Sequence, residues 1–209
     1  MAEKPKHVRA VTFIDGQNLF YSAKNAFGYD YPNYNPLRLS QAFCKKNGWN
    51  LSQVRFYTGI PSKDDNDFWN AFWTNKAAAM NRAGVHCHMR TLVYRDTLKQ
   101  LQDGSITRVR VGFEKGIDVR IALDLVRMAR TESFDVAVIF SQDQDLAEAA
   151  IEIKSISKEQ DRWIGVVSAY PEGQSTKKQR GIDQTMWLPF DKELYCSCLD
   201  ARDFRPRLP

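Results

Sequence analysis

The chain has 209 residues, of which 43% are hydrophobic and 26% are charged, as in ordinary globular proteins. Its length suits one α/β domain with a sizeable core, and no segment is long and apolar enough to cross a membrane. Residues 1–10 lack the apolar stretch of a secretion signal, so we expect a cytoplasmic protein. The net charge of +5 favours contact with a polyanion, because phosphates bind Lys and Arg and release counterions.

Apolar runs alternate with helical patterns along the chain. The runs predict strands at 7–14, 53–59, 85–93, 135–140 and 163–167. The helical periodicity predicts helices at 37–46, 64–83, 117–130 and 143–157. Asp64 or Asp65 is the expected N-cap of the second helix, and Gly84 is expected to end it. The first strand is followed by a predicted turn at Asp15–Asn18, and the chain beyond Pro171 has no clear pattern.

The region 94–114 differs from its surroundings. It has Gly104 between two polar, partly alternating runs, which predicts a hairpin or extended loop inserted before the next helix. No linker or repeat divides the chain, so we expect one domain over 1–190 and a C-terminal tail over 191–209. Alternating strands and helices predict an α/β fold with a mainly parallel central sheet and helices on both faces.

Acidic residues follow the predicted strands where those strands end. Asp15 comes directly after the first strand, and Asp143 and Asp145 follow the strand that ends at Phe140. Asp118 opens a helix on its apolar side, where a carboxylate is costly to bury unless it is paired or binds metal. Because ligands bind at the carboxyl ends of parallel strands, we expect these four side chains at one edge of the sheet.

Clustered carboxylates repel one another, and a divalent cation relieves that repulsion. Oxygen-only ligands suit Mg²⁺ or Mn²⁺, which activate water and stabilise charge on a phosphoryl group. Each acid also has a simpler interpretation as a turn residue or as a first-turn acid favoured by the helix dipole. Three separate chain segments that deliver acids to one edge are harder to explain as caps alone.

Asp124 lies four residues after Arg120 and three before Arg127, which favours a surface ion pair over a catalytic role. We therefore leave it out of the predicted catalytic set.

Four motifs in this order resemble the NYN domain family, and specifically the LabA-like branch of the PIN-like nucleases. The resemblance spans roughly Val8 to Leu188. The motifs are Phe-Ile-Asp-Gly-Gln-Asn at 13–18, Tyr-Thr-Gly-Ile-Pro at 57–61, Lys-Gly-Ile-Asp at 115–118 with the helix to Asp124, and Ser-Gln-Asp-Gln-Asp-Leu at 141–146.

The resemblance implies a three-layer PIN-like fold and metal-dependent hydrolysis of phosphodiester bonds in RNA, with Mg²⁺ or Mn²⁺ as cofactor. It makes Asp15, Asp118, Asp143 and Asp145 the catalytic, metal-binding carboxylates. Asn18, Ser141 and Lys115 would contact metal or substrate, and Asp124 matches a recurrent family acid. RNA is expected over DNA as partner, and homo-oligomerisation is left open.

A basic cluster of Lys177, Lys178 and Arg180 is expected to bind RNA phosphates or to be a solvated loop. Arg90, Arg95, Arg108 and Arg110, in and beside the inserted segment, are further candidates for the same role.

One departure from the family pattern is Gln142, where the family usually has Gly, a residue that permits close backbone approach. This substitution favours an alternative, a catalytically weak RNA- or DNA-binding module that keeps the fold. A phosphatase or nucleotidase on a similar sheet is opposed by Gln17, where such enzymes would need a second Asp, and by the lack of a Gly-rich phosphate cradle.

Overall fold

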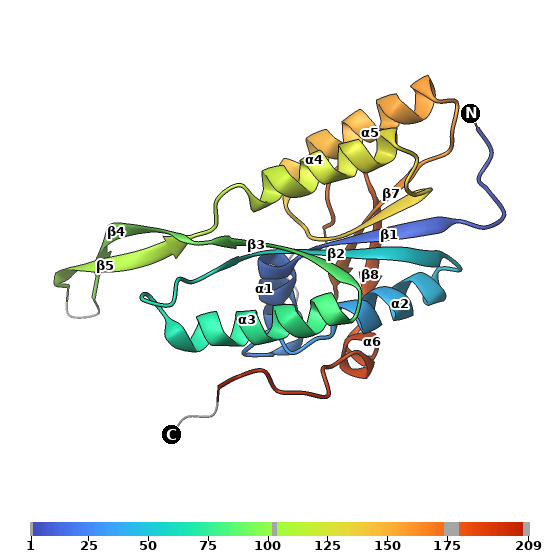
Figure 1. Ribbon diagram of the computed structural model, residues 1–209. Coiled ribbons are helices and arrows are strands. Elements are labelled where there is room, and N and C mark those ends of the chain that lie inside the picture. The colour runs from blue at the N-terminus through green and yellow to red at the C-terminus, as the bar shows by residue number, and fades with distance from the viewer. Residues whose placement is uncertain (1, 102–103, 174–179, 207–209) are drawn as a thin grey trace.

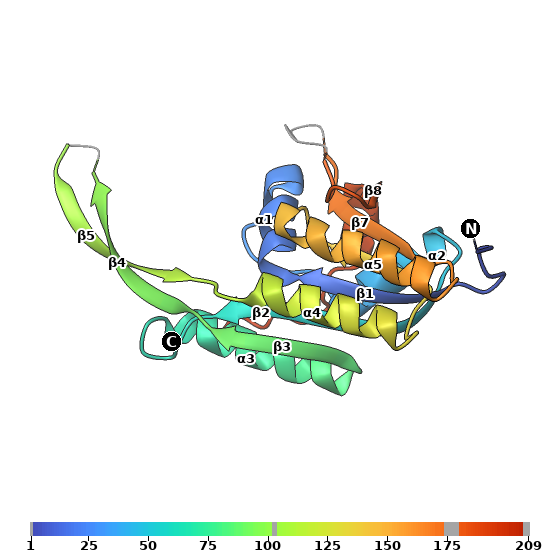
Figure 2. The same cartoon turned by 90° about the horizontal axis from the view of Figure 1, so that it is seen from above.

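The computed structural model describes residues 2–101, 104–173 and 180–206. A six-stranded sheet with strand order β3-β2-β1-β6-β7-β8 forms its centre, and every neighbouring pair in it is parallel. Helices cover both faces, as Figures 1 and 2 show. The predicted α/β architecture with a parallel sheet between helical layers is confirmed. The strands are β1 (Arg9–Asp15), β2 (Asn50–Ile60), β3 (Val85–Thr91), β6 (Val136–Phe140), β7 (Gly165–Pro171) and β8 (Met186–Phe190).

The helices fall into two layers on opposite faces of the sheet (Figure 1). One layer contains α1 (Gly16–Phe27), α2 (Pro36–Lys46), α3 (Asp67–Arg82) and α6 (Lys192–Ser197). The other contains α4 (Ile117–Arg130) and α5 (Ala147–Glu159), with the short 3₁₀ turn η1 (Gln144–Leu146) before α5.

Two separate apolar cores fill the space between the sheet and these layers. Along β6, Val138 and Phe140 belong to the core under α1–α3, whereas Ala137 and Ile139 belong to the core under α4 and α5. This alternation follows from the two-residue period of a strand. It explains why β6 is an unbroken apolar run, since both of its faces are buried.

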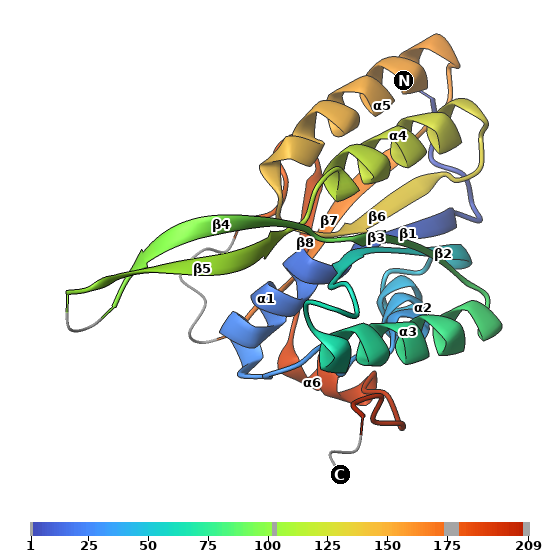
Figure 3. The ribbon, with the colours of Figure 1, turned by 60° about the vertical axis from the view of Figure 1, so that its left-hand side comes forward.

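The inserted segment is an antiparallel hairpin of β4 (Val93–Gln100) and β5 (Ile106–Phe113), which confirms the predicted hairpin. These two strands pair with each other and form a separate sheet. The hairpin projects beyond the body of the molecule in all three views (Figure 3). We call it the arm.

Several elements differ from the sequence predictions. The helix α1 was not predicted, because Asp15–Asn18 was interpreted as a turn. Leu19, Ala23 and Phe27 do recur at helical spacing, and all three are buried. The predicted cap of α3 was wrong: Asn66 is the N-cap, and its side chain accepts a hydrogen bond from the Trp69 amide. The strand β8 and helix α6 lie in the stretch that carried no pattern.

The chain after Asp191 packs against the core rather than leaving it. Tyr195, Cys198 and Phe204 are buried in the core under α1–α3. The buried Lys76 ammonium donates to the Tyr34 carbonyl and pairs with Asp200, which ties this segment to α3.

Candidate active site at the carboxyl edge of the sheet

We call the carboxyl edge of the sheet around Asp15 and Asp143 the acidic edge. It lies between β1 and β6, where the strand order β3-β2-β1 changes to β6-β7-β8. Ligands of open parallel sheets bind outside the strand ends at this switch point. Asp15 is the last residue of β1, and Ser141 follows directly after β6. Asp15, only 6% exposed, is also the N-cap of α1, with its Oδ1 accepting the Asn18 amide at 3.0 Å. Asp15 therefore does cap α1, and it still lies at the carboxyl edge of the sheet while doing so.

A chain of hydrogen bonds joins the first and last motifs. The buried Ser141 hydroxyl donates to Asp15 Oδ2 at 3.3 Å and accepts the Asp143 amide at 3.1 Å. Asn18 Oδ1 accepts the Gln142 amide at 3.0 Å. These bonds fix the loop after β6 against the start of α1. Asn18 and Ser141 are thus positioned beside the acids by β1 and β6.

Asp15 is held in an environment that opposes its ionisation. Burial is the largest cause that raises its pKa to about 6, and the charge of Asp143 raises it further. Hydrogen bonds from Asn18, Ser141 and Gln17 lower the pKa but do not offset burial. The carboxylates of β1 and of the loop after β6 are therefore close enough to repel each other.

Glu114 is an acid of this edge that the sequence analysis missed. Its Oε1 accepts the Gly59 amide at the end of β2. Burial, then the charge of Asp15, raises its pKa to about 7, and Asp118 adds to this. A Cβ on Gly59 would lie 3.0 Å from the Glu114 side chain, so glycine permits this close approach. Glu114 directly precedes the Lys115–Asp118 motif, which is the signal that was available in the sequence.

Asp118 lies in the first turn of α4 and is half-buried. Its electrostatic effect on Glu114 places it at the same edge. The preceding Gly116 has φ 73°, a left-handed conformation that favours glycine and turns the chain from the arm into α4. Asp145 is exposed, and its backbone amide donates to Asp143 Oδ1 at 3.1 Å, so it lies on the outer side of the loop.

The donor chemistry of this edge suits a hard divalent cation, because Asp15, Glu114, Asp118 and Asp143 offer only carboxylate oxygens. Among the described residues, however, no three or more His, Cys, Asp or Glu side chains are already gathered as metal ligands. A bound cation would offset the repulsion between these carboxylates.

Asp124 belongs to a different structure from the acidic edge. It is 2% exposed and pairs with Arg120 and Arg127, each at 3.1 Å, and with Arg55 at 2.9 Å. The Tyr57 hydroxyl donates to it at 2.9 Å. Burial acts to raise the pKa of Asp124, but these partners lower it overall. The predicted ion pairs are confirmed, but the Asp124 carboxylate is buried, whereas the side chains of Arg120 and Arg127 reach the surface.

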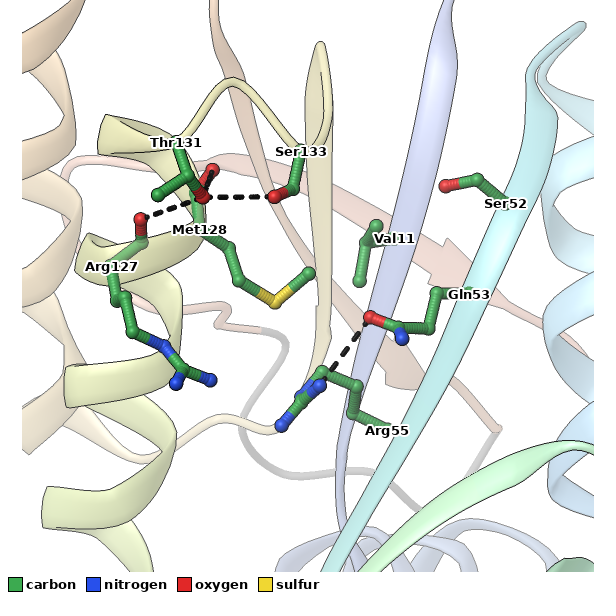
Figure 4. Close-up of a pocket in the computed structure, with 8 residues that line it drawn as sticks. All are labelled: Val11, Ser52, Gln53, Arg55, Arg127, Met128, Thr131 and Ser133. Atoms are coloured by element: carbon green, nitrogen blue, oxygen red, sulfur yellow. Dashed lines mark hydrogen bonds between the residues drawn. The ribbon is translucent and has the colours of Figure 1, made fainter.

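Arg55 and Arg127 of this network approach from β2 and α4 across a hollow of about 510 Å³ (Figure 4). Its lining includes Val11, four residues before Asp15 on β1, so the hollow lies away from the carboxyl edge. Because both guanidiniums are paired with Asp124, we assign this hollow a structural role.

Gln142 occupies the position where the family pattern has Gly, and its backbone needs no glycine. Among the described non-glycine residues, positive φ occurs at Glu132, Asp161 and Gln184 and not here. Its side chain accepts from the Ser22 hydroxyl at 2.9 Å and donates to the Arg180 carbonyl at 2.7 Å. Gln142 therefore connects α1, the loop after β6 and the chain before β8.

The structure describes only some of the basic residues that were predicted to bind RNA. Arg180 lies next to Gln142, and its guanidinium pairs with Asp183. Lys115 is exposed at the start of α4, and its carbonyl accepts from Arg90 at 3.3 Å. Lys177 and Lys178 lie outside the described residues.

An all-parallel sheet with carboxylates at its switch point defines the class: a PIN-like α/β fold. The chain belongs to the NYN domain family, which matches residues 9–186. Proteins of this family are in general nucleases that act on nucleic acid, and they usually use divalent metals. Assignment to the LabA-like branch stays a prediction.

Comparison with solved structures supports the fold. The chain is similar to a protein of unknown function, VPA0982, from Vibrio parahaemolyticus, with a TM-score of 0.54 and 16% identity over 91% of this chain and 98% of the other. A deacetylase crystallised with teicoplanin matches with a TM-score of 0.35 and 13% identity over 76% of this chain and 68% of the other. This TM-score is too low to indicate a shared fold. No curated protein sequence matches the chain. No helix within the described residues is long and apolar enough to span a membrane.

Proposed function

We propose that this protein is a metal-dependent endoribonuclease whose catalytic centre is the acidic edge. The observation that supports this most directly is the meeting of acids from three chain segments at the switch point of the sheet. Burial and mutual repulsion raise the pKa of both Asp15 and Glu114 there. Such a site favours a cation, and its chemistry matches the nuclease character of the family.

We assign the holding of Mg²⁺ or Mn²⁺ to Asp15, Asp118 and Asp143, with Glu114 beside them. Asp145 is included in the proposed metal-binding set, although its side chain is exposed. When bound, the cation would lower the pKa of water and offset charge on the phosphoryl group. Ser141 and Asn18 hold the loop that contains Asp143 against Asp15 and the start of α1 through hydrogen bonds. Lys115 and Arg180 would hold substrate phosphates beside the acids.

The reaction is attack of water on phosphorus, with cleavage of one P–O bond and transfer of a proton to the leaving oxygen. The chain contributes orientation and charge, because Asp15 ends β1, Asp118 starts α4, and Asp143 lies in a short loop that hydrogen bonds fix to the start of α1.

Cleavage of end-labelled single-stranded RNA and DNA, each with Mg²⁺, Mn²⁺ or EDTA, tests the proposal. We expect RNA to be cut only with a divalent cation, and Asp118→Asn and Asp143→Asn to lower the single-turnover rate by orders of magnitude. Glu148→Gln, an exposed acid at the start of α5, is the matched control and should cut at the wild-type rate. Equal rates for Asp118→Asn and wild type would refute the site.

The same assay separates the binding-module alternative, which predicts RNA binding without cleavage under every condition. Gln142 does not have the positive φ that would favour glycine, so the backbone at this position supports neither interpretation over the other.

A further inference from the structure

The two faces of the arm differ in charge. Side chains alternate along a strand, and directly opposite residues of an antiparallel pair share a face. One face, which we call the odd face, contains Val93, Arg95, Thr97, Lys99, Thr107, Val109, Val111 and Phe113. The other, the even face, contains Tyr94, Asp96, Leu98, Gln100, Ile106, Arg108, Arg110 and Gly112. The described part of the odd face has two cations and no acid.

On the even face, Arg108 is exposed and makes no ion pair with a described residue, but the charge of Arg110 is neutralised. Arg110 lies opposite Asp96, and its guanidinium also pairs with Asp65 at 3.0 Å. Arg95 and Lys99 of the odd face are exposed and make no ion pair with any described residue. The odd face is therefore the more attractive of the two for an anion.

A hollow of about 500 Å³ lies at the base of the arm. We call it the basal groove. Its cations are Arg90, Lys115 and Arg120, of which Arg120 is already paired with Asp124, and no acid lines it within the described part of the chain. Val93 of the odd face also lines the groove, so the two surfaces meet there.

Positive charge is crowded around this groove. Burial lowers the pKa of His88 on β3, and the charges of Arg120, Arg90 and Arg55 lower it further. Asp124 is the nearby acid that acts in the opposite direction. Arg90 and Lys115 make no ion pair with a described residue, so a phosphate backbone in the groove would supply the negative charge that they lack.

The groove borders the acidic edge, because Lys115 and Gly116 lie between Glu114 and Asp118 in the chain. We propose that the basal groove and the odd face of the arm form one track for the RNA strand on one side of the cut. This proposal rests on the proposed function for the identity of the strand. The eight residues of β4 span about 27 Å, or roughly eight stacked nucleotides.

Neighbouring rungs of the arm provide a matched test. Lys99→Gln and Arg108→Gln each remove one positive charge, from opposite faces and from adjacent positions of the ladder. Binding is measured by fluorescence anisotropy in EDTA, so that no cleavage occurs, with labelled RNA of about 24 nucleotides, long enough to cover the track and the site. DNA of the same sequence shows whether the track requires RNA or only a phosphate backbone. Melting curves confirm that each variant is folded.

We expect Lys99→Gln to weaken RNA binding about five-fold at 0.1 M salt and to reduce the salt slope by about 0.7, as for one lost phosphate contact. Arg95→Gln combined with Lys99→Gln should double the change in slope. Arg108→Gln should change affinity by less than about two-fold, because its charge lies on the far side of the ribbon. An RNA that ends at the site and lacks the flanking nucleotides should be insensitive to Lys99→Gln.

Equal losses from Lys99→Gln and Arg108→Gln would overturn the track, since only net charge would then matter. Unchanged binding in the double variant would also overturn it. If the odd-face variants bind normally and Leu98→Ser converts a dimer to a monomer in sedimentation, the arm serves a second copy of the chain and the proposal is wrong. Cleavage by the wild-type protein is measured in a separate assay. If binding depends on the face of the arm but no RNA is cut, the track is supported and only the proposed nuclease activity is refuted.

Discussion

Replacing Asp15 with Asn should stabilise the metal-free protein at neutral pH while removing its response to metal. The pKa of Asp15 is raised to about 6 from an ordinary 3.8, so its ionised form costs about 3 kcal/mol in the folded state. This cost is absent below the unfolded pKa and complete once the pH exceeds the folded pKa. Wild type should therefore lose stability relative to the variant as the pH rises through about 4 to 6.

The pH dependence isolates this effect from the hydrogen bonds of Asp15. Asn keeps an acceptor for the Asn18 amide but changes the contact with Ser141, and that loss is the same at each pH. Between pH 4.5 and 7.5 the stability difference should shift by about 2 kcal/mol in favour of the variant. Urea unfolding in EDTA at both pH values measures it.

Mn²⁺ should act in the opposite direction. At one hundred times its Kd, a bound cation stabilises wild type by about 2.7 kcal/mol, and Asp15→Asn should lose most of this gain. Glu148→Gln should match wild type with and without Mn²⁺. A stability difference between Asp15→Asn and wild type that does not change with pH would refute the reasoning that Asp15 is a buried, repelled carboxylate.

Three further predictions follow from other contacts. Asp124→Asn should destabilise the protein by about 3–5 kcal/mol in thermal or urea unfolding, because Arg55 is left as a buried charge without its acid; an unchanged midpoint would contradict the network. Glu114→Gln should bind Mn²⁺ more weakly than wild type in calorimetry and cut RNA more slowly, while the exposed Glu148→Gln serves as control; wild-type binding and cleavage would remove Glu114 from the site. Gln142→Gly should lower the melting temperature, since the links to Ser22 and Arg180 are lost, and should not raise the cleavage rate; a large gain in rate would show that Gln142 impairs catalysis.

Much of the fold was determined by local sequence. The nearly unbroken apolar run at 135–140 predicts a strand covered on both faces, and the residues of β6 do divide between the two cores. The helix 117–130 was predicted with its observed bounds because its apolar stripe is strong and Gly116 precedes it. Polar alternation around Gly104 predicted the hairpin.

Other elements depend on tertiary contacts. The helix α1 begins at Gly16, is capped by the Asp15 side chain, and is held by Leu19, Ala23 and Phe27 in the core. The strand β8 is at the sheet edge with mostly exposed or half-buried residues, so it lacks a strong apolar pattern and exists through pairing with β7.

The sequence also predicted which acids follow strand ends, and the parallel sheet is the reason that Asp15 and Asp143 come close. It also predicted the ion pairs of Asp124 with Arg120 and Arg127, but not the burial of Asp124 or the place of Glu114 at the edge. Asp124 matches a family acid yet is enclosed by Arg55, which is 69 residues away, and Tyr57. Glu114 follows the hairpin without a motif of its own, and only the packing of Gly59 against it brings it to the edge. Charges that meet across the sheet are set by the tertiary structure, because local periodicity carries no information about which distant side chains become neighbours.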